Sequence, residues 1–395
     1  MANDVAQRLR GNWNYPTAIR FGAGRIAELA DGCRSLGMKR PLLVTDHGLK
    51  ASAMIDAALA ANKSTGLPTG LFAEVRSNPV GRNVGDGVEV FRAGGHDGVI
   101  AFGGGSAIDT AKAIALMVGQ KRPIWDFEDR EDRWTRVDVS GMAPVVSVPT
   151  TSGTGAEIGR VSVITDEAGP TKKLIFHPRM MPGLVIADPA LTLGLPPKLT
   201  AWTGMDALAH NLEAYCAAGF HPIAEGVALE GVRRIKTWLP AAVKDGSNLE
   251  ARSHLMVAST MGAAAFQKGL GAIHALSHPV GSLFDSHHGL TNAVFMPYVL
   301  AYNRPAIAGK LMALARYLDL KPATPESVLD WIIALRAELE IPHTLGALGV
   351  PRDALPRLAA LAENDQTCAG NPRPVGRAEL LSLYEAAHDG RLPDE

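Results

Sequence analysis

The first half of the chain alternates short runs rich in β-branched residues with helical patterns, and this alternation constrains the fold more than any other feature. The runs are PLLVTD at 41–46, GVIAF at 98–102, APVVSVPT at 143–150 and GLVIAD at 183–188. Strands that alternate with helices in this way are typical of a parallel α/β sheet. From about residue 195 the pattern changes to apolar residues at helical spacing, as at 226–239 and 327–340. Thr324-Pro325-Glu326 predicts the start of the second of these helices.

The length of 395 residues exceeds what one hydrophobic core usually supports, which favours two domains. We place the boundary in LTLGLPPKLT at 191–200, where two prolines and a glycine separate the strand-like half from the helical half. The sequence therefore predicts an α/β domain at 1–194 and an all-helical domain at 195–395.

The composition excludes several classes of protein. With 47% hydrophobic residues, 20% charged residues and a net charge of -1, the chain is typical of a soluble globular protein without the basic face that nucleic-acid binding requires. Cys33, Cys216 and Cys368 are widely spaced, which argues against a disulfide framework and a thiolate zinc site. Because no apolar stretch has the length of a signal peptide or a membrane span, we expect a cytoplasmic protein. We expect its partners to be small molecules and a second copy in a homodimer, the commonest closed assembly.

A glycine-rich turn follows the run GVIAF and opens the helical pattern GGGSAIDTAKAIA at 103–115. The free amide groups and the dipole at such a helix start favour a bound phosphate, and glycines let it approach the backbone closely. A turn that only needs a positive φ is the alternative, but one glycine would satisfy it. Three glycines followed by Ser106 therefore favour binding. We interpret the other glycine pattern, Gly22-Ala23-Gly24, as an ordinary turn, because it lacks the third glycine of a dinucleotide fingerprint.

Two further features suit a nucleotide. Asp46 ends the run PLLVTD, where its carboxylate could accept hydrogen bonds from a ribose and would repel a 2′-phosphate, which favours NAD over NADP. A helix cap for the segment that starts at His47 is an equally good interpretation. PTTSGTGAE at 149–157 supplies three threonine hydroxyls after a strand, suited to phosphate or nicotinamide contacts, although such clusters are also typical of capped helix starts.

The second half carries a set of metal-ligand types. Asp206 and His210 are four residues apart in GMDALAHNLEAY, which places both side chains on one face of a helix. The segment GLGAIHALSHPVGSLFDSHHGLTNA contains four of the 12 histidines of the chain. One carboxylate and several imidazoles suit Fe(II), Zn(II) or a similar ion. An isolated Asp–His pair is more often a surface pair, and an isolated histidine is more often a core residue or a cap, but the combination favours a metal site.

These segments, together with CAGNPRP at 368–374, resemble in their order the iron-containing (group III) alcohol dehydrogenase family, nearly from end to end. The resemblance implies an N-terminal NAD-binding domain and a helical, metal-binding C-terminal domain. It further implies hydride transfer between NAD and a small primary alcohol or hydroxy acid, with Fe(II), or alternatively Zn(II), as the metal.

The resemblance also assigns residues. It implies that the metal ligands are Asp206, His210, His274 and His288, and that His278 lies near the nicotinamide and the substrate. There His278 is expected to relay a proton or, alternatively, only to pack against the ligands. We prefer His288 to the adjacent His287 because of its spacing from His278 and the following Gly289. The residues that the resemblance assigns to the cofactor are Asp46, Asn78, Gly104, Gly105, Ser106, Ala107, Thr150, Thr151, Thr154 and Lys172, the last with Lys173 beside it.

The substrate is less constrained by the sequence. Lys268, six residues before His274 and close to Phe266, could pair with a carboxylate on the substrate, and a solvent-facing lysine that caps a helix is the alternative. Arg373 in CAGNPRP is a second candidate for an anion contact. We expect Cys368 to line the site rather than to act as a nucleophile, because no base partner is evident.

Three other functions compete with this interpretation. Glycerol dehydrogenase and dehydroquinate synthase resemble this architecture but usually prefer zinc, and the set of one aspartate and three histidines disfavours them. Maleylacetate reductases resemble it too, but they are shorter and often lack the full ligand set. A catalytically silent protein that binds a metal and a nucleotide, as a sensor or scaffold, is the alternative outside the enzymes.

Overall fold

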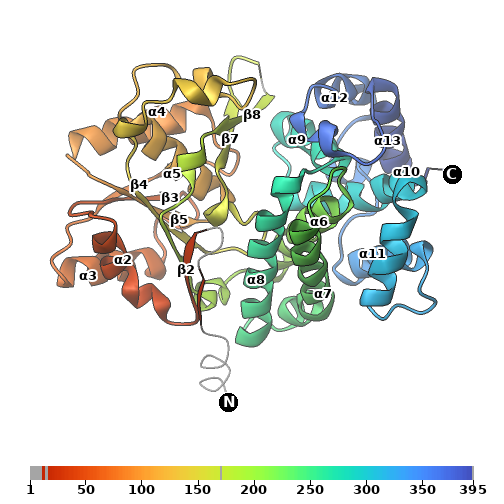
Figure 1. Cartoon of the computed structure of the whole chain (residues 1–395), viewed down its shortest axis with the longest axis horizontal. Coiled ribbons are helices and arrows are strands. Elements are labelled where there is room, and N and C mark those ends of the chain that lie inside the picture. Colours follow the sequence, from red (N-terminus) through yellow and green to blue (C-terminus); the bar gives the residue numbers. More distant parts are fainter. Residues whose placement is uncertain (1–10, 14–16, 170, 394–395) are drawn as a thin grey trace. The chain divides into compact units, whose positions relative to one another are not determined.

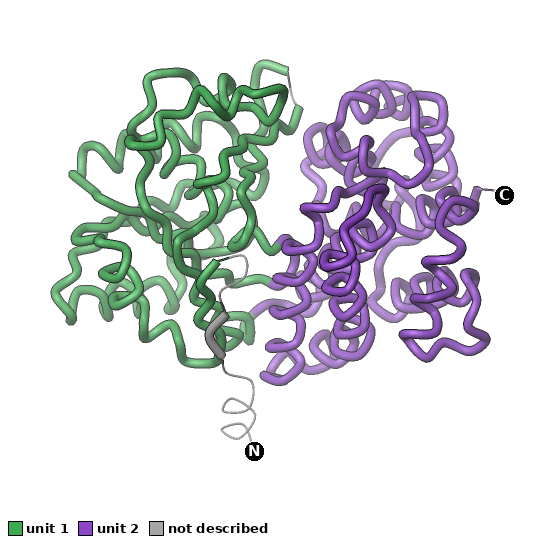
Figure 2. Tube along the Cα trace, viewed as in Figure 1, with its two compact units in different colours: residues 1–151, 155–194 green, residues 152–154, 195–395 purple. Residues whose placement is uncertain are grey.

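The computed structural model describes residues 11–13, 17–169 and 171–393. The chain divides into two compact units, shown in two colours in Figure 2. The first unit contains residues 1–151 and 155–194, and the second contains residues 152–154 and 195–395. The short segment 152–154 thus leaves the first unit and returns to it within the threonine-rich segment PTTSGTGAE.

The first unit is built on a sheet with the strand order β1-β2-β9-β6-β5-β3-β4. Figure 1 labels its strands β2, β3, β4 and β5. Among the described strands of this sheet, only the β1–β2 pair is antiparallel, and the other pairs are parallel, as the sequence predicts. A separate antiparallel hairpin is formed by β7 and β8. The strands are β1 (Gly11–Trp13), β2 (Ala18–Phe21), β3 (Leu42–Asp46), β4 (Gly70–Val75), β5 (Val99–Gly103), β6 (Val145–Pro149), β7 (Val161–Asp166), β8 (Thr171–Phe176) and β9 (Leu184–Ala187).

The strands β3, β5, β6 and β9 are buried on both faces of the sheet, as their nearly continuous apolar runs require. Successive residues enter opposite cores: Leu42 and Val44 pack in one core with α4 and α5, while Leu43 packs in the other with α2 and α3. The helices of this unit are α2 (Leu29–Ser35), α3 (Ala53–Ser64), α4 (Gly81–Ala93) and α5 (Gly105–Met117), with 3₁₀ turns η1 (Arg25–Glu28), η2 (Ile124–Phe127), η3 (Arg133–Arg136), η4 (Val139–Gly141), η5 (Ala156–Ile158), η6 (Pro178–Met180) and η7 (Pro189–Thr192).

The second unit is helical and is built around one hydrophobic core, again as the sequence predicts. The predicted helix start at Thr324 is confirmed, since its hydroxyl accepts a hydrogen bond from Ser327 N with Pro325 at the first helical position. The elements are α6 (Pro197–Cys216), α7 (Pro222–Lys244), α8 (Leu249–Ala265), η8 (Phe266–Lys268), α9 (Ala272–Phe284), α10 (His288–Tyr317), α11 (Pro325–Glu338), η9 (Gly346–Leu348), η10 (Arg352–Ala354), α12 (Leu355–Ala362), η11 (Gln366–Gly370) and α13 (Arg377–Asp389).

Helix α6 lies at the centre of this unit, and nearly all its residues after Thr200 are buried. Glycines let the neighbouring helices approach it: a Cβ at Gly231 of α7 would lie 1.9 Å from Asn211 Oδ1. Asn211 in turn donates to the carbonyl of Ala207 in its own helix and to that of Ala258 in α8. The polar side chains of α6 are therefore held in a fixed, dry environment. Within the described part of the chain, no helix combines the length and apolar character needed to cross a bilayer.

Candidate metal centre and cofactor turn

Asp206 and His210 lie one turn apart on α6, and both side chains are buried. His210 Nδ1 is 3.8 Å from Asp206 Oδ2, so the two residues share one face of the helix, as their spacing predicts. Burial lowers the pKa of His210 to about 4, which keeps the imidazole neutral and its lone pair available near neutral pH.

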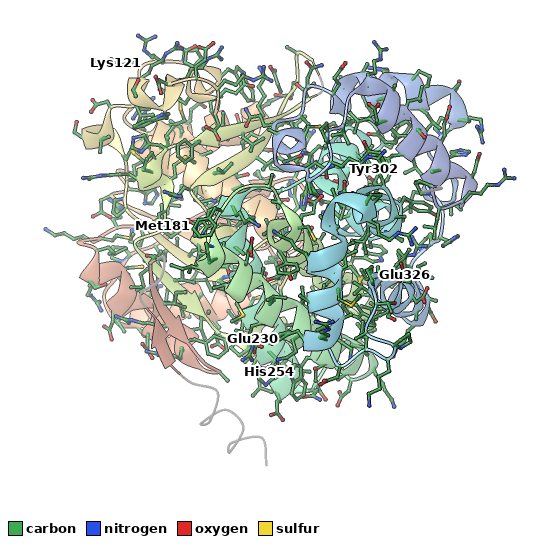
Figure 3. All side chains as sticks on the ribbon, turned by 45° about the vertical axis from the view of Figure 1, so that its right-hand side comes forward. Lys121, Met181, Glu230, His254, Tyr302 and Glu326 are labelled. Carbon is green, nitrogen blue, oxygen red and sulfur yellow. The ribbon has the colours of Figure 1, made fainter. Side chains whose placement is uncertain are left out.

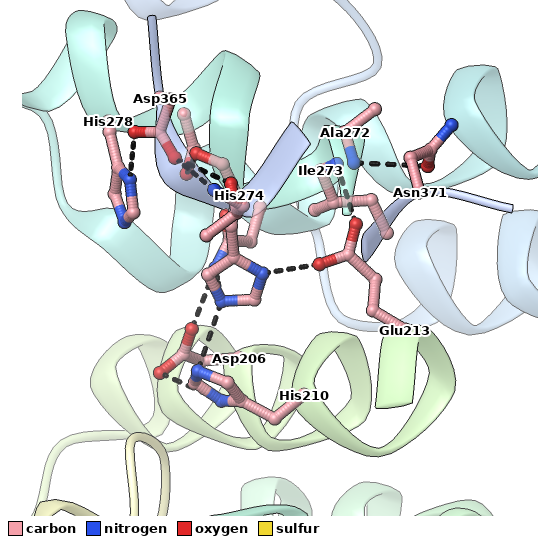
Figure 4. Close-up of polar contacts among 12 residues, drawn as sticks. Asp206, His210, Glu213, Ala272, Ile273, His274, His278, Asp365 and Asn371 are labelled. Carbon is pink, nitrogen blue, oxygen red and sulfur yellow. Dashed lines mark hydrogen bonds and ion pairs between the residues drawn. The ribbon is translucent and has the colours of Figure 1, made fainter. Parts of the chain in front are cut away.

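His274 on α9 faces this pair across the helix interface (Figure 4). Its Nε2 atom lies 3.0 Å from Nε2 of His210, and ligand atoms of Asp206, His210 and His274 all lie within 4.8 Å of one another. All three residues are buried, and His210 Nδ1 has no hydrogen-bond partner among the described residues. A carboxylate and two imidazoles that converge in a dry site, with one imidazole nitrogen left without a hydrogen-bond partner, fit a divalent cation.

His288, at the first position of α10, lies beside this group and is more exposed. Its Nε2 is 3.7 Å from Asp206 Oδ1, and its ring centroid is 5.3 Å from that of His274. The adjacent His287 has a different role: it caps α10 by accepting from Leu290 N, and its ring packs 5.0 Å from Trp202. These contacts support the choice of His288 as the fourth ligand, which stays a prediction.

Asn292 is a residue of this centre that the sequence analysis missed. It lies one turn after His288 on α10, and its side-chain amide donates to Asp206 Oδ1 at 2.8 Å. The same amide nitrogen is 3.1 Å from His288 Nε2 and 3.3 Å from His274 Nε2. Its four-residue spacing from His288, the spacing that singled out Asp206 and His210, is the signal that could have found it.

Glu213 was also missed, although it follows Asp206 by seven residues and so lies on the same face of α6. Its Oε2 is 2.6 Å from His274 Nδ1, and its Oε1 accepts from Ile273 N at 2.7 Å (Figure 4). Burial acts to lower the pKa of His274, but the carboxylates of Glu213 and Asp206 outweigh it and the pKa is raised.

His278 lies one turn after His274 on α9 and is paired with a carboxylate that the sequence analysis did not single out. Its Nδ1 is 2.7 Å from Asp365 Oδ2 (Figure 4). Its ring also stacks on that of His288, with 5.3 Å between the ring centroids. The other oxygen of Asp365 caps η11 by accepting from the amide and hydroxyl of Thr367. Burial acts to raise the pKa of the Asp365 carboxyl, but the charge of His278 and the hydrogen bonds lower it to about 2.

The candidate substrate residues have partners of their own. Phe266 packs its ring 5.4 Å from that of His210. The amine of Lys268 donates to Glu225 Oε1 at 2.8 Å and to the carbonyl of Tyr215 at 3.1 Å, and its side chain is only 2% exposed. Lys268 is therefore not solvent-facing, although its amine does bond to a carbonyl in the last turn of α6. A contact with a substrate anion would require the amine to leave Glu225 and this carbonyl.

The two candidates in the segment CAGNPRP also make local contacts. The guanidinium of Arg373 lies 4.2 Å from the ring centroid of Tyr302, labelled in Figure 3, and donates to the carbonyl of the same residue. Cys368 is a free thiol near the carbonyl of Ala362, and burial raises its pKa to about 12. A thiol with so high a pKa agrees with the expectation that it is not a nucleophile.

In the first unit, the predicted cofactor residues gather where the parallel strands end. Gly103 has φ 147°, which only glycine adopts readily, and Gly104 caps α5. A Cβ at Gly103 would lie 3.3 Å from Asp46 Oδ2, and one at Gly104 would lie 3.3 Å from Thr151 Oγ1. Thr150 N donates to the carbonyl of Gly103.

The remaining cofactor candidates lie around this turn or apart from it. Ser106 donates to the carbonyl of Ser77, the residue before Asn78, while Asp46 itself accepts from Leu49 N at 3.1 Å. Gly105 and Ala107 belong to the first turn of α5. Lys172 lies on the separate hairpin, opposite Thr165. Thr154 belongs to the second unit. In the same segment the carbonyl of Gly153 accepts from Ser259 Oγ of α8, and a Cβ at Gly153 would lie 3.3 Å from Asp206 Oδ2.

Comparison with known proteins agrees with this arrangement. Residues 16–189 match the family model described as iron-containing alcohol dehydrogenase, and residues 200–388 match that of the C-terminal domain of the same family. The chain is 38% identical to 4-hydroxybutyrate dehydrogenase of Cupriavidus necator over 94% of this chain and 98% of that protein. It is 33% identical to NAD-dependent methanol dehydrogenase of Bacillus methanolicus over 95% and 99% of the two chains.

A solved structure of 1,3-propanediol oxidoreductase superimposes with a TM-score of 0.88 and 34% identity, over 93% of this chain and 97% of that one. A helical unit with a candidate centre of one carboxylate and several imidazoles, joined in one chain to an α/β unit with a glycine turn, fits a metal-dependent oxidoreductase. The chain belongs to the iron-containing alcohol dehydrogenase family and is an alcohol oxidoreductase.

Proposed function

We propose that this protein interconverts a small primary alcohol or hydroxy acid and its aldehyde, with NAD as the hydride carrier and Fe(II) as the metal. The observation that carries the proposal is the buried convergence of Asp206, His210 and His274, with His288 beside them. The glycine turn at the start of α5 and the similarity to an NAD-dependent methanol dehydrogenase support NAD. We assign the cofactor to residues 1–194 and the metal to residues 195–395.

The residues of the second unit have separable roles in this reaction. Asp206, His210, His274 and His288 would hold the cation, which when bound supplies Lewis-acid chemistry that favours loss of the hydroxyl proton of an alcohol. Hydride acceptance at C4 is the chemistry that the nicotinamide supplies when bound.

His278 is suited to move the proton. Because Asp365 accepts at Nδ1, the imidazole keeps its lone pair on Nε2, where it can take up the hydroxyl proton and pass it to solvent. The alternative role of His278 is only to pack against the ring of His288.

The substrate class is proposed from the relatives. One similar protein is named for a hydroxy acid, 4-hydroxybutyrate, and another for the neutral alcohol methanol. Since Lys268 and Arg373 are engaged by Glu225 and Tyr302, the described structure of the second unit favours neither class. We also propose a cytoplasmic homodimer, the commonest closed assembly, and light scattering at several protein concentrations tests the dimer.

The test is the oxidation of NADH by anaerobically purified, Fe(II)-loaded protein with aldehydes that have or lack a carboxylate, each repeated after chelation. We expect turnover that chelation abolishes and Fe(II) restores. The matched control is the Asp206→Ala variant, which we expect to be inactive under all these conditions. Stoichiometric bound metal without turnover with NADH or NADPH would favour the catalytically silent alternative.

A further inference from the structure

The carboxylate of Glu213 determines which nitrogen of His274 carries the proton. Its Oε2 lies 2.6 Å from His274 Nδ1, and both side chains are buried. An ionised carboxylate only accepts hydrogen bonds, so the ring has to donate from Nδ1. The lone pair of the neutral ring is then on Nε2, the atom that lies 3.0 Å from His210 Nε2 within the candidate metal centre.

Glu213 is itself held in place from a second side. Its Oε1 accepts from the backbone amide of Ile273, in the first turn of α9, at 2.7 Å. A negative charge at a helix N-terminus is favoured by the helix dipole. A Cβ at Gly271, just before the helix, would lie 3.0 Å from the same oxygen, so the glycine leaves room for the carboxylate. One side chain from α6 therefore fixes both the start of α9 and the ring that α9 carries.

We propose that Glu213 is a positioning residue that holds His274 in the tautomer with the proton on Nδ1 and so strengthens the binding of a divalent metal through Nε2. The inference rests on the metal centre of the proposed function and adds a residue to it. Histidine ligands commonly donate their second ring N–H to a carboxylate, which orients the ring and raises its basicity, and loss of such a partner typically weakens metal binding about 10–100-fold.

The competing explanation is that Glu213 only anchors the start of α9. The chain offers a matched control for this role, because Asn371 Oδ1 accepts from the neighbouring amide of Ala272 at 3.2 Å (Figure 4). Asn371 is buried and caps the same helix end, but among the described residues its side chain bonds to Ala272, Asn303 and the carbonyl of Arg373, and not to the ring of His274. Its removal should disturb the helix start without changing the tautomer of His274.

The substitution Glu213→Gln tests the proton assignment directly. If the new amide group faces His274 Nδ1, the ring has to accept there and its proton moves to Nε2, where it blocks the metal. If the amide oxygen faces the ring instead, the amide N–H groups face the N–H of Ile273 and that hydrogen bond is lost. The first orientation thus moves the ring proton onto Nε2, and the second keeps the tautomer but leaves a neutral acceptor that raises the basicity of the ring less than a carboxylate does, so metal binding weakens in both.

The experiment titrates metal-free wild type, E213Q and N371A with Co(II) against a competing chelator, and records the visible Co(II) spectrum and the melting temperature of each protein without metal. We expect E213Q to bind Co(II) about 10–100-fold more weakly, with a changed spectrum, and N371A to lose melting temperature but keep the affinity of the wild type. Should E213Q not fold, E213D, which draws the carboxylate back by one methylene, replaces it with the same expected direction.

The outcomes separate this inference from the proposed function. Equal affinity of E213Q and wild type, or an equal loss of affinity in N371A, would overturn the positioning role and leave the metal centre intact. A wild-type protein that binds no Co(II) would overturn both the inference and the metal centre on which it rests.

Discussion

Two adjacent histidines, His287 and His288, differ in what they contact, and this difference predicts different effects on metal binding. Since His288 Nε2 lies near Asp206, we expect His288→Ala to weaken metal binding at least about tenfold. Loss of a residue that only contacts a ligand already weakens binding about 10–100-fold, so loss of a ligand should cost no less. His287→Ala should instead cost roughly 1 kcal/mol of stability through loss of the α10 cap. Chelator competition and urea unfolding of both variants measure the two effects. A reversed pattern would show that His287 is the ligand.

The hydrogen bond between Asp365 and His278 predicts that Asp365→Asn, which keeps the shape of the side chain but removes its negative charge, lowers kcat. In Asp365→Asn the new amide group faces Nδ1, so the ring proton moves to Nε2 and the atom proposed to accept the substrate proton is occupied. We expect kcat to fall by about 10²–10⁴, the usual contribution of a positioned acid or base, at full metal occupancy. Thr367→Val, which removes a donor to the other carboxylate oxygen, is the control and should keep most activity. Unchanged kcat in D365N would leave His278 only a packing role.

At the scale of secondary-structure elements, η8 is tied to three helices by a shared ion pair. Lys268 of η8 and Lys310 of α10 both donate to Glu225 Oε1 of α7 and to the carbonyl of Tyr215 near the end of α6. We expect Lys268→Met to lower the free energy of unfolding by about 0.5–1.5 kcal/mol, because Glu225 and the carbonyl of Tyr215 each lose one of two donors. The ratio of KM for carboxylated to plain aldehydes should not change. Urea unfolding and steady-state kinetics measure these quantities. A rise in KM confined to carboxylated aldehydes would restore Lys268 as a substrate anchor.

The β7–β8 hairpin predicts a dependence of stability on pH. Lys173 pairs with Asp166 at 2.7 Å, and this hydrogen bond lowers the pKa of Asp166 below its ordinary value of 3.8. A carboxyl whose pKa is lowered by folding adds stability above its ordinary pKa, and this contribution is lost as the pH falls through the lowered value. We expect Asp166→Asn to cost up to about 1 kcal/mol near neutral pH.

Urea unfolding of wild type and D166N between about pH 5 and about pH 3 checks the sign, because the difference between the proteins should shrink toward the acid end. Lys173→Met, which removes the partner, serves as the control and should show the same trend. A difference that is constant with pH would mean that the pair does not set the pKa of Asp166.

The elements of the fold were predictable from the sequence where the signal is local. Apolar runs marked β3, β5, β6 and β9, and the cap at Thr324 marked α11. In the site, the spacing of Asp206 and His210 was sufficient because one helix carries both. The contacts of Lys268 with Glu225 and of His278 with Asp365 join residues 43 and 87 positions apart, and no periodicity reports such tertiary neighbours. The hairpin at 161–176 was likewise not predicted.

At the scale of the whole molecule, the two candidate ligand sites are built by different units with separate cores. The metal residues come from α6, α9 and α10, whereas the glycine turn lies between β5 and α5 on the sheet of the first unit. A ligand that binds only the folded state stabilises it, by about 2.7 kcal/mol at a concentration one hundred times its Kd. Because the chain has two units, one melting temperature does not report where this stabilisation acts.

Hydrogen exchange resolves the location, since it measures the opening of each segment separately. We expect Co(II) to slow amide exchange most in α6, α9 and the start of α10, and NAD to slow it most at the end of β5 and the first turn of α5. In the Asp206→Ala variant the effect of Co(II) should vanish and that of NAD should persist, because Asp206 lies outside the glycine turn. Protection by Co(II) that is strongest in the first unit would place the metal elsewhere and contradict the assignment of its ligands to the helical unit.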